Sequence, residues 1–278
     1  MAPKVDPQNL RETFGRFRVL ILGRANAGKT TILQKVCNTA ENPEIYNAKG
    51  DKVWDIMHAL MGAQRGNHDI RNEMVFKSNP GFVFHDSCGF EAGSAEEFED
   101  MKRFISERAN ATKLEERIHA IWQVAPSRVW RSYCIPMDDH CRTIQRAEEK
   151  FFSECNTGNV PVIVIFTKFE ALRPVAFGEI KKDLGGLSKE ERSKRIAERV
   201  QELFKNTRVW DRLCELCDTE NHARPKSYIC LENMNRADTN CNTLLECTAF
   251  ALDSEELKLC FVSTQQSNME LCIKYAVE

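Results

Sequence analysis

A short glycine-rich segment near the start of the chain has the residue types of a phosphate-binding loop. Residues 23–31 read Gly-Arg-Ala-Asn-Ala-Gly-Lys-Thr-Thr, which matches the spacing G-x-x-x-x-G-K-T of loops that hold phosphates. Glycines let successive backbone N–H groups face one point, and the positive end of a following helix strengthens the attraction for an anion there. We therefore expect a phosphate site formed by Gly23, Asn26, Ala27, Gly28, Lys29, Thr30 and Thr31.

The residues on either side of this loop predict the elements that must hold it. Residues 17–22 are mostly apolar, as is typical of a buried strand, whereas Ile32, Leu33 and Val36 have helical spacing. In that setting Lys29 would reach the β- and γ-phosphates of a nucleotide, and the Thr30 hydroxyl would bind Mg²⁺. The loop alone does not separate kinases, ATPases and GTPases.

Two more expected strands end in residues suited to a metal and to a base. Residues 81–86 form a largely apolar run that ends in a carboxylate, with a glycine three positions later. Residues 160–166 are typical of a parallel-sheet strand, and Thr-Lys-Phe-Glu stands at its carboxyl end. Ligands of open α/β sheets bind at those strand ends. We therefore expect a second set of site residues at this edge, namely Asp86, Gly89, Thr167, Lys168 and Glu170.

With these segments in this order, the sequence resembles the G-domain family of P-loop GTPases from about Arg16 to its end. The loop with Asn26 is most similar to the Era/TrmE-like and septin-related branch, and fungal G domain-containing proteins are similar across the whole chain. The resemblance implies that Asp86 holds Mg²⁺ through water and that the Gly89 N–H contacts the γ-phosphate. It also implies that the catalytic groups are those of Lys29, Thr30, Asp86 and Gly89.

The resemblance also assigns residues to the guanine base. The family motif is Asn-Lys-x-Asp, often with Thr in the first place. Its carboxylate accepts hydrogen bonds from the guanine N1–H and exocyclic amine, a pattern that adenine does not offer. Glu170 is one methylene longer than the family's Asp, which puts guanine selectivity in question, and the Lys168 stem would lie over the base. Ser263 and Thr264, after an expected last strand at 259–262, loosely match the loop that contacts the guanine oxygen.

One further residue of the loop and two departures from the family bear on catalysis. In TrmE-like members the loop asparagine helps to hold K⁺, which makes Asn26 a candidate K⁺ ligand; the alternative is a loop-stabilising side chain. Phe90 stands where G proteins place the glutamine that orients water, and residues 40–111 contain no threonine for the first switch. His68 and Asp69 are the candidates to replace that threonine. We therefore expect slow hydrolysis unless K⁺, a second subunit or an activating protein supplies the missing charge.

The remaining segments are expected to complete the domain. Residues 118–122 begin a strand that residues 123–132 interrupt, either as a loop or as a gene-model error. The segment between Glu170 and the expected last strand is far longer than a usual connection of roughly two to six residues. A capping box at 188–191 opens a charged helix there, whose apolar stripe is either core or a partner surface. Residues 228–231 are expected to form a small extra strand and residues 244–252 another helix.

Composition limits the classes of protein that fit. The 278 residues include 39 basic and 41 acidic side chains and are 42% hydrophobic, which supports a packed core and gives no basic excess for general nucleic-acid binding. No apolar run approaches the ~18 residues of a membrane span, so we expect a soluble, cytoplasmic protein. The twelve cysteines are expected to be mostly buried thiols. The spacing Cys214-x2-Cys217-x4-His222 falls short of the four ligands of a structural zinc site.

The expected fold is α/β: a three-layer P-loop NTPase (G domain) with a mostly parallel sheet and an α-helical insertion before the last strand. Residues 1–15 would be an N-terminal extension and 16–278 the domain, with the insertion at about 172–250. The expected function is GTP binding with slow Mg²⁺-dependent hydrolysis, as a nucleotide switch with a homodimer or an activating protein as partner. The alternative is a non-hydrolysing assembly or scaffold module, which Phe90 and the missing threonine favour. A P-loop kinase is a third reading, although no lid or acceptor site is evident.

Overall fold

The centre of the protein is a seven-stranded sheet in the order β2-β3-β4-β1-β5-β6-β7. The computed structural model describes residues 15–23, 26–53, 69–87, 95–126, 146–216 and 223–265. The strands are β1 (Phe17–Gly23), β2 (Glu44–Tyr46), β3 (Glu73–Phe76), β4 (Asn79–Asp86), β5 (Ala120–Pro126), β6 (Val162–Thr167) and β7 (Pro225–Cys230). The five strands from β4 to β7 in this order run parallel, and β2 and β3 add an antiparallel edge.

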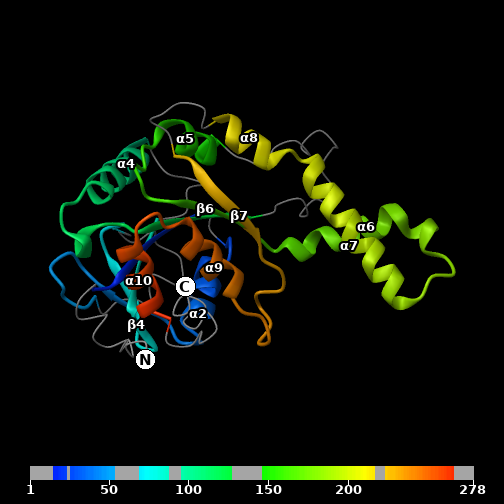
Figure 1. Ribbon diagram of the computed structural model, residues 1–278, viewed down its shortest axis with the longest axis horizontal. Helices are drawn as coiled ribbons and strands as arrows, with labels where there is room; N and C mark the ends of the chain where they lie inside the picture. The colour runs from blue at the N-terminus through cyan, green and yellow to red at the C-terminus, as the bar shows by residue number, and fades with distance from the viewer. Residues whose placement is uncertain are drawn as a thin grey trace, which may run out of the picture.

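Helices cover both faces of this sheet (Figure 1). Their bounds are α2 (Lys29–Val36), α4 (Ala95–Ala109), α5 (Arg146–Glu154), α6 (Arg173–Ile180), α7 (Lys189–Asn206), α8 (Val209–Leu216), α9 (Asn242–Ala251) and α10 (Glu255–Ser263). Three short 3-10 turns add η1 (Leu114–Glu116), η3 (Phe169–Leu172) and η4 (Lys181–Leu184). Most helices follow a strand, as crossovers between parallel strands require.

The core is divided by the sheet into two apolar layers. One layer packs α2, α9 and α10 against side chains such as Phe84 and Trp122, and the other packs α4, α5, α7 and α8 against side chains such as Leu22 and Val164. Neighbouring residues of β1, such as Ile21 and Leu22, belong to opposite layers, because successive side chains of a strand point to opposite faces. The three-layer α/β architecture with a mostly parallel sheet is therefore confirmed.

The strand that was expected to break off after Trp122 continues without interruption. Gln123, Val124, Ala125 and Pro126 pair in register with residues 164–167 of β6, so the predicted interruption is wrong for these four positions. The burial of Gln123 explains the error, because a buried polar residue interrupts an apolar run without interrupting the ladder. Residues 127–136 of the predicted interruption and its return strand lie outside the described residues.

The last strand of the sheet is β7, and the prediction of a strand at 259–262 is wrong. Those residues lie in α10, where Leu257, Cys260 and Phe261 recur at helical spacing and two glutamates, Glu255 and Glu256, occupy the first turn. The segment expected to be a small extra strand is the end of β7, which pairs with β6 in parallel. The predicted helix at 244–252 corresponds to α9.

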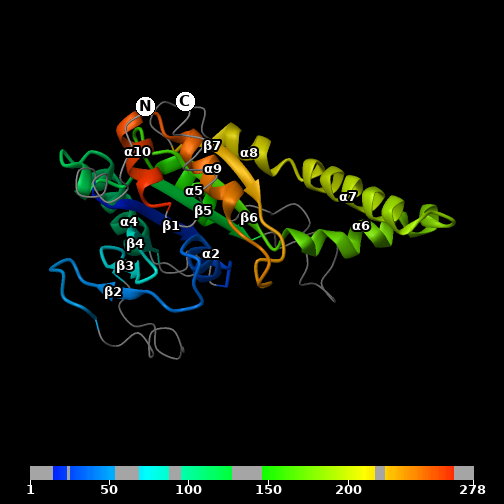
Figure 2. The same ribbon diagram turned by 60° about the horizontal axis from the view of Figure 1, so that its bottom comes forward.

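Helices do precede the last strand: they run from η3 to α8, between β6 and β7. The range of about 172–250 that was expected for the insertion also contains β7 and most of α9. Both views show α6 and the first part of α7 as a hairpin that extends away from the sheet (Figures 1 and 2). The capping box is confirmed: Ser188 accepts from the Glu191 N–H, and Glu191 accepts from the Ser188 N–H.

The apolar stripe of α7 is anchored only at its C-terminal end. Val200 and Phe204 are buried in the core, whereas Ile196 and Leu203 are partly buried against it. The core interpretation of the stripe is therefore confirmed for these four side chains. The predicted extension at residues 1–14 lies outside the described residues, and no described helix is both long and apolar enough to span a bilayer.

Candidate functional site

The expected phosphate loop joins the central strand to the first helix. β1 ends at Gly23 and α2 begins at Lys29, so the predicted strand and helix on either side of the loop are present. Asn26 and Gly28 have φ of 58° and 91°, the left-handed region that glycine adopts most easily. Among the described residues, a Cβ on Gly28 would meet no heavy atom within 4 Å. The backbone conformation, and not packing, therefore requires glycine at this position.

Gly23 is required for two reasons, a φ of 151° and the close approach of two strands. A Cβ at this position would overlap the carbonyl oxygen of Val124 on β5. Gly23 and Val124 are register partners, so the carboxyl end of β5 lies directly against the start of the loop. The lack of a side chain at Gly23 allows the start of the loop to lie in contact with β5.

Lys29 and Asp86 meet at this edge. Lys29 Nζ donates to the Gly23 carbonyl oxygen at 2.7 Å and lies 3.6 Å from Asp86 Oδ1. The two side chains are only 11% and 28% exposed, so their attraction is screened less than that of a surface pair. Asp86 is placed by the sheet, because it is the register partner of Ile21 in β1. The lysine and the carboxylate predicted for phosphates and metal are therefore neighbours.

The oxygen donors at this point suit Mg²⁺. Thr30 is exposed in the first turn of α2, Thr31 is half-buried, and Asp86 ends the adjacent strand. Mg²⁺ in nucleotide sites takes one or two protein oxygens and completes its shell with phosphates and water. Among the described residues there is no cluster of three or more His, Cys, Asp or Glu for a metal, and this type of site does not need one.

The end of β6 is bonded to the loop. Thr167 Oγ1 donates to the Ala27 carbonyl oxygen at 2.8 Å, and Lys168 Nζ donates to that of Asn26 at 2.8 Å. Thr167 is buried, and Lys168 has φ of 55°, a conformation that persists in a non-glycine residue only where the surroundings hold it. The segment predicted to bind the base is therefore attached to the segment predicted to bind phosphates.

Glu170 reaches a loop that the sequence reading missed. Its Oε2 accepts from the Asn233 N–H at 2.9 Å, and Asn233 follows β7 with φ of 53°. Leu231 holds the same loop to β6 through bonds with Phe166 and Phe169. The loop at 231–235 is thus the third segment at this strand-end edge. The available signal was the partial alternation of polar and apolar residues in Pro-Lys-Ser-Tyr-Ile-Cys, the sequence of β7.

Ser263 and Thr264 do not belong to this edge, so their prediction as base contacts is wrong. Ser263 ends α10 and Thr264 follows it; both side chains donate to carbonyl oxygens one turn back, those of Cys260 and Phe261. Thr264 accepts through its carbonyl oxygen from Asn79, the first residue of β4. Because β4 ends at Asp86, Thr264 lies at the opposite end of the sheet.

The switch residues are mostly outside the described part of the chain. Gly89 and Phe90 lie there, as do Cys88 and His68. Asp69 is described, and its carboxylate accepts from the Arg71 N–H at 3.0 Å. Among the described residues, no contact links Asp69 to the loop, and both candidates to replace the switch threonine stay predictions.

A buried polar cluster supports the strand that carries Asp86. His85 Nδ1 faces the Ile70 carbonyl oxygen at 3.0 Å, and its Nε2 lies 3.4 Å from Arg18, which is paired with Glu73 at 2.6 Å. Because a carbonyl oxygen only accepts, Nδ1 carries the proton. Burial and the nearby Arg18 lower the pKa of His85 to about 4. His85 is therefore neutral at pH 7 and joins β4 to the segment that precedes β3.

The described cysteines support the interpretation of buried thiols. Burial raises the pKa of Cys37, Cys155, Cys241 and Cys260 to about 12, so these thiols are protonated and poorly nucleophilic at pH 7. Cys214 is exposed, whereas the other two members of the weighed zinc spacing, Cys217 and His222, lie outside the described residues.

Comparison with known proteins finds solved structures of low similarity. No family model matches the chain, and no curated protein matches it. Two variants of the protein SsGBP have TM-scores of 0.36 and 12% identity, covering 96% and 87% of this chain and 59% and 57% of theirs. A GDP-bound mutant of the S. thermophilus FeoB G-domain has a TM-score of 0.33 and 13% identity, covering 72% of this chain and 98% of that one.

These similarities do not assign a family. This chain spans less than two thirds of the length of the SsGBP variants. Its own sheet order, together with a phosphate-loop sequence between β1 and α2, shows an α/β fold consistent with a P-loop G domain.

Proposed function

We propose that this protein binds guanine nucleotides and hydrolyses GTP slowly with the help of Mg²⁺. The observation that supports the proposal best is the meeting of three distant segments at one edge of the sheet. The Ala27 and Asn26 carbonyls of the loop are bonded to Thr167 and Lys168, and Lys29 lies beside Asp86. A phosphate-binding loop, a carboxylate and a charged strand end are the parts from which a nucleotide site is made.

Each group would have a separate task. The N–H groups of the loop and Lys29 would hold the phosphates, and Thr30 and Asp86 would hold Mg²⁺. The bound Mg²⁺ would neutralise charge on the β- and γ-phosphates. Asn26, which is exposed and in a left-handed conformation, is a candidate K⁺ ligand.

Base selection would depend on Lys168 and Glu170. One Glu170 oxygen is engaged by the Asn233 N–H, which fixes the direction of the carboxylate. A carboxylate accepts hydrogen bonds and does not donate them, so it would favour the N1–H and amine edge of guanine. The adjacent loop at 231–235 would supply backbone groups to the same base.

Slow turnover is expected from the sequence. Phe90 has no polar group with which to orient water, so the charge of the transition state would need support from K⁺, a second subunit or an activating protein. Phe90 also favours the second candidate function, a non-hydrolysing module whose assembly with partners depends on the bound nucleotide.

GTP turnover by the purified protein tests the proposal. We expect slow, Mg²⁺-dependent hydrolysis that K⁺ accelerates relative to Na⁺ and that Lys29→Ala abolishes, while the exposed-lysine control Lys205→Ala keeps it. Rapid hydrolysis in Na⁺ that Phe90→Gln leaves unchanged would contradict the slow mechanism. Tight GTP binding with no turnover in any salt would favour the assembly module.

A further inference from the structure

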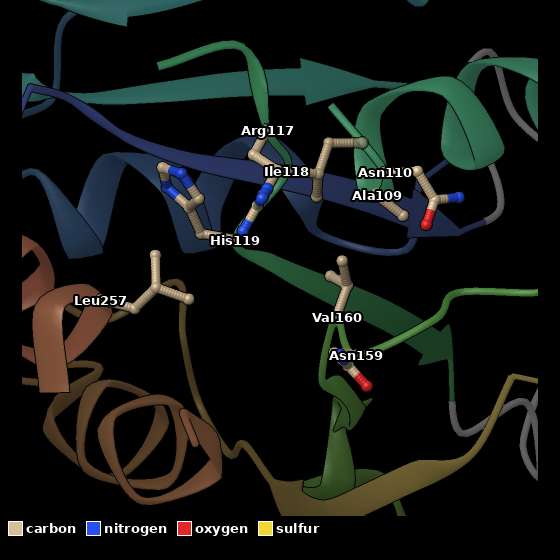
Figure 3. A pocket seen from close by; sticks show the side chains of 8 residues that line it. All are labelled: Ala109, Asn110, Arg117, Ile118, His119, Asn159, Val160 and Leu257. Atoms are coloured by element: carbon tan, nitrogen blue, oxygen red, sulfur yellow. The ribbon is translucent and has the colours of Figure 1, made fainter. Parts of the chain in front are cut away.

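A small pocket lies at the end of the sheet away from the phosphate loop. It has a volume of about 240 Å³ and is formed where chain segments enter β5 and β6 and where α4 ends (Figure 3). Arg117 and Ile118 precede β5, Asn159 and Val160 precede β6, and Leu257 belongs to α10. Because parallel strands carry the phosphate loop at their other ends, this pocket is separate from the candidate nucleotide site.

Arg117 brings a fixed positive charge to this pocket. Its Nε donates to the Ala111 carbonyl oxygen at 2.8 Å, and the side chain is half-buried. Within the described part of the chain, no carboxylate lies within ion-pair distance of its guanidinium and its two terminal amino groups have no hydrogen-bond partner. A guanidinium with free terminal amino groups presents two parallel donors to an oxyanion.

The loop that carries Arg117 is held in place. Arg117 N–H donates to the Leu114 carbonyl oxygen at 3.0 Å, and Ile118 N–H donates to that of Arg108 at 3.2 Å. The Arg108 side chain donates to the Glu116 carbonyl oxygen at 2.9 Å. A ligand would therefore meet a preorganised cation, and little side-chain ordering would be needed on binding.

The neighbouring histidine is not available to a ligand. His119 Nδ1 accepts from the Arg18 N–H at 3.0 Å, so Nε2 carries the proton and faces the Leu114 carbonyl oxygen at 2.9 Å. Burial lowers the pKa of His119 to about 4, so the ring is neutral at pH 7. Arg117 is consequently the only charged group among the described residues that line the pocket.

The other lining groups favour a ligand with an aliphatic body. Val160 and Ile118 are buried, Leu257 is half-buried, and Asn110 and Asn159 stand at the exposed margin. A bare oxyanion such as inorganic phosphate would satisfy the arginine but leave the exposed part of Leu257 in water, whereas a short branched acid would cover it. The volume is below the roughly 300–1,000 Å³ of sites for drug-sized ligands, which limits the body to a few carbons.

We propose that this pocket binds a carboxylate with a short branched aliphatic body, with the carboxylate on Arg117 and the body against Val160, Ile118 and Leu257. Two sources share this chemistry: a free short-chain acid and the C-terminal residue of a peptide ending in an aliphatic side chain. For a peptide, Asn110 and Asn159 are placed at the margin where its last amide would lie. The proposal is independent of the nucleotide site.

Titration calorimetry with defined probes tests this site. 3-Methylbutanoate represents the free acid, and N-acetyl-leucine represents the end of a peptide. Two controls each lack one feature: 3-methylbutan-1-ol has no negative charge, and inorganic phosphate has no aliphatic body. We expect saturable binding of one or both acids, with much weaker binding of the alcohol and of phosphate. The acid that binds more tightly identifies the source.

Variants connect the binding to this pocket. Arg117→Gln should weaken acid binding by about tenfold or more, because a charge-assisted pair is lost, whereas Arg103→Gln, an exposed arginine on α4, should not. Asn159→Phe should block the pocket without touching Arg117, which keeps the test valid if Arg117→Gln folds poorly. No saturable acid binding by the wild type, phosphate binding as tight as the acids, or acid binding unchanged in both pocket variants would overturn the proposal.

Discussion

Two buried histidines, His85 and His119, should make the free energy of unfolding depend on pH. Burial lowers the pKa values of His85 and His119 to about 4, whereas both would titrate near 6.5 in the unfolded chain. Below pH 6.5 the unfolded state therefore binds protons that the folded state does not. The stability that these histidines contribute is complete above pH 6.5 and is lost as the pH falls toward 4.

Urea unfolding at different pH values measures this effect. Between neutral pH and about pH 5, each histidine should lower the free energy of unfolding by roughly 2 kcal/mol. His119→Gln, which keeps a donor and an acceptor but does not titrate, should remove about half of the pH dependence. A stability that is constant between pH 7 and pH 5 would show that these imidazoles are not held neutral.

At the level of elements, the two glycines of the loop share a positive φ, 151° at Gly23 and 91° at Gly28, and differ in packing. Gly23→Ala places a methyl group on the Val124 carbonyl oxygen, whereas Gly28→Ala meets open space. We expect Gly23→Ala to destabilise the protein by roughly 2–6 kcal/mol and Gly28→Ala by about 1–3 kcal/mol. Chemical denaturation of the pair checks the order.

The same two variants should differ in their effect on ligand binding. No atom of the described part of the chain lies within 4 Å of a Cβ at Gly28, which belongs to the loop proposed to hold phosphates. Gly28→Ala should therefore lose nucleotide affinity out of proportion to its loss of stability. Equal destabilisation of the two variants would contradict the close approach of β1 and β5.

The helical hairpin of α6 and α7 should behave as a separable element. Ser188→Ala removes one half of the capping box and should cost about 1 kcal/mol of local helix stability. Hydrogen exchange should then become faster in the first turns of α7, where no side chain is buried, and stay unchanged near Val200 and Phe204. Faster exchange throughout the sheet would show that the hairpin is part of the global core.

For the whole molecule, the sequence predicted the parts with local signatures. The phosphate loop has fixed spacing, β4 and β6 contain largely apolar runs, and the capping box begins α7. The structure has β4, β6 and α7 close to where they were expected, and β1 and α2 on either side of the loop. These signals are short-range, so they can be read without knowing what packs against them.

The features that could not be predicted from the sequence depend on tertiary contacts. Residues 259–262 are as apolar as a strand, but they are buried in a helix; a short apolar run does not separate the two. β7 is an edge strand with alternating exposure, and its place beside β6 is set by a long connection. The loop at 231–235 was missed for that reason, because its role follows only from the identity of the last strand.

We propose that the edge where the phosphate loop, β6 and the 231–235 loop meet selects a guanine nucleotide. Displacement of a fluorescent GDP analogue from the purified protein by GTP and by ATP tests it most directly, with Glu170→Gln as the variant that keeps length and removes charge. We expect GTP to displace the analogue at far lower concentration than ATP, and Glu170→Gln to lower this preference for GTP by about tenfold or more. Equal displacement by ATP and GTP in the wild-type protein would contradict it.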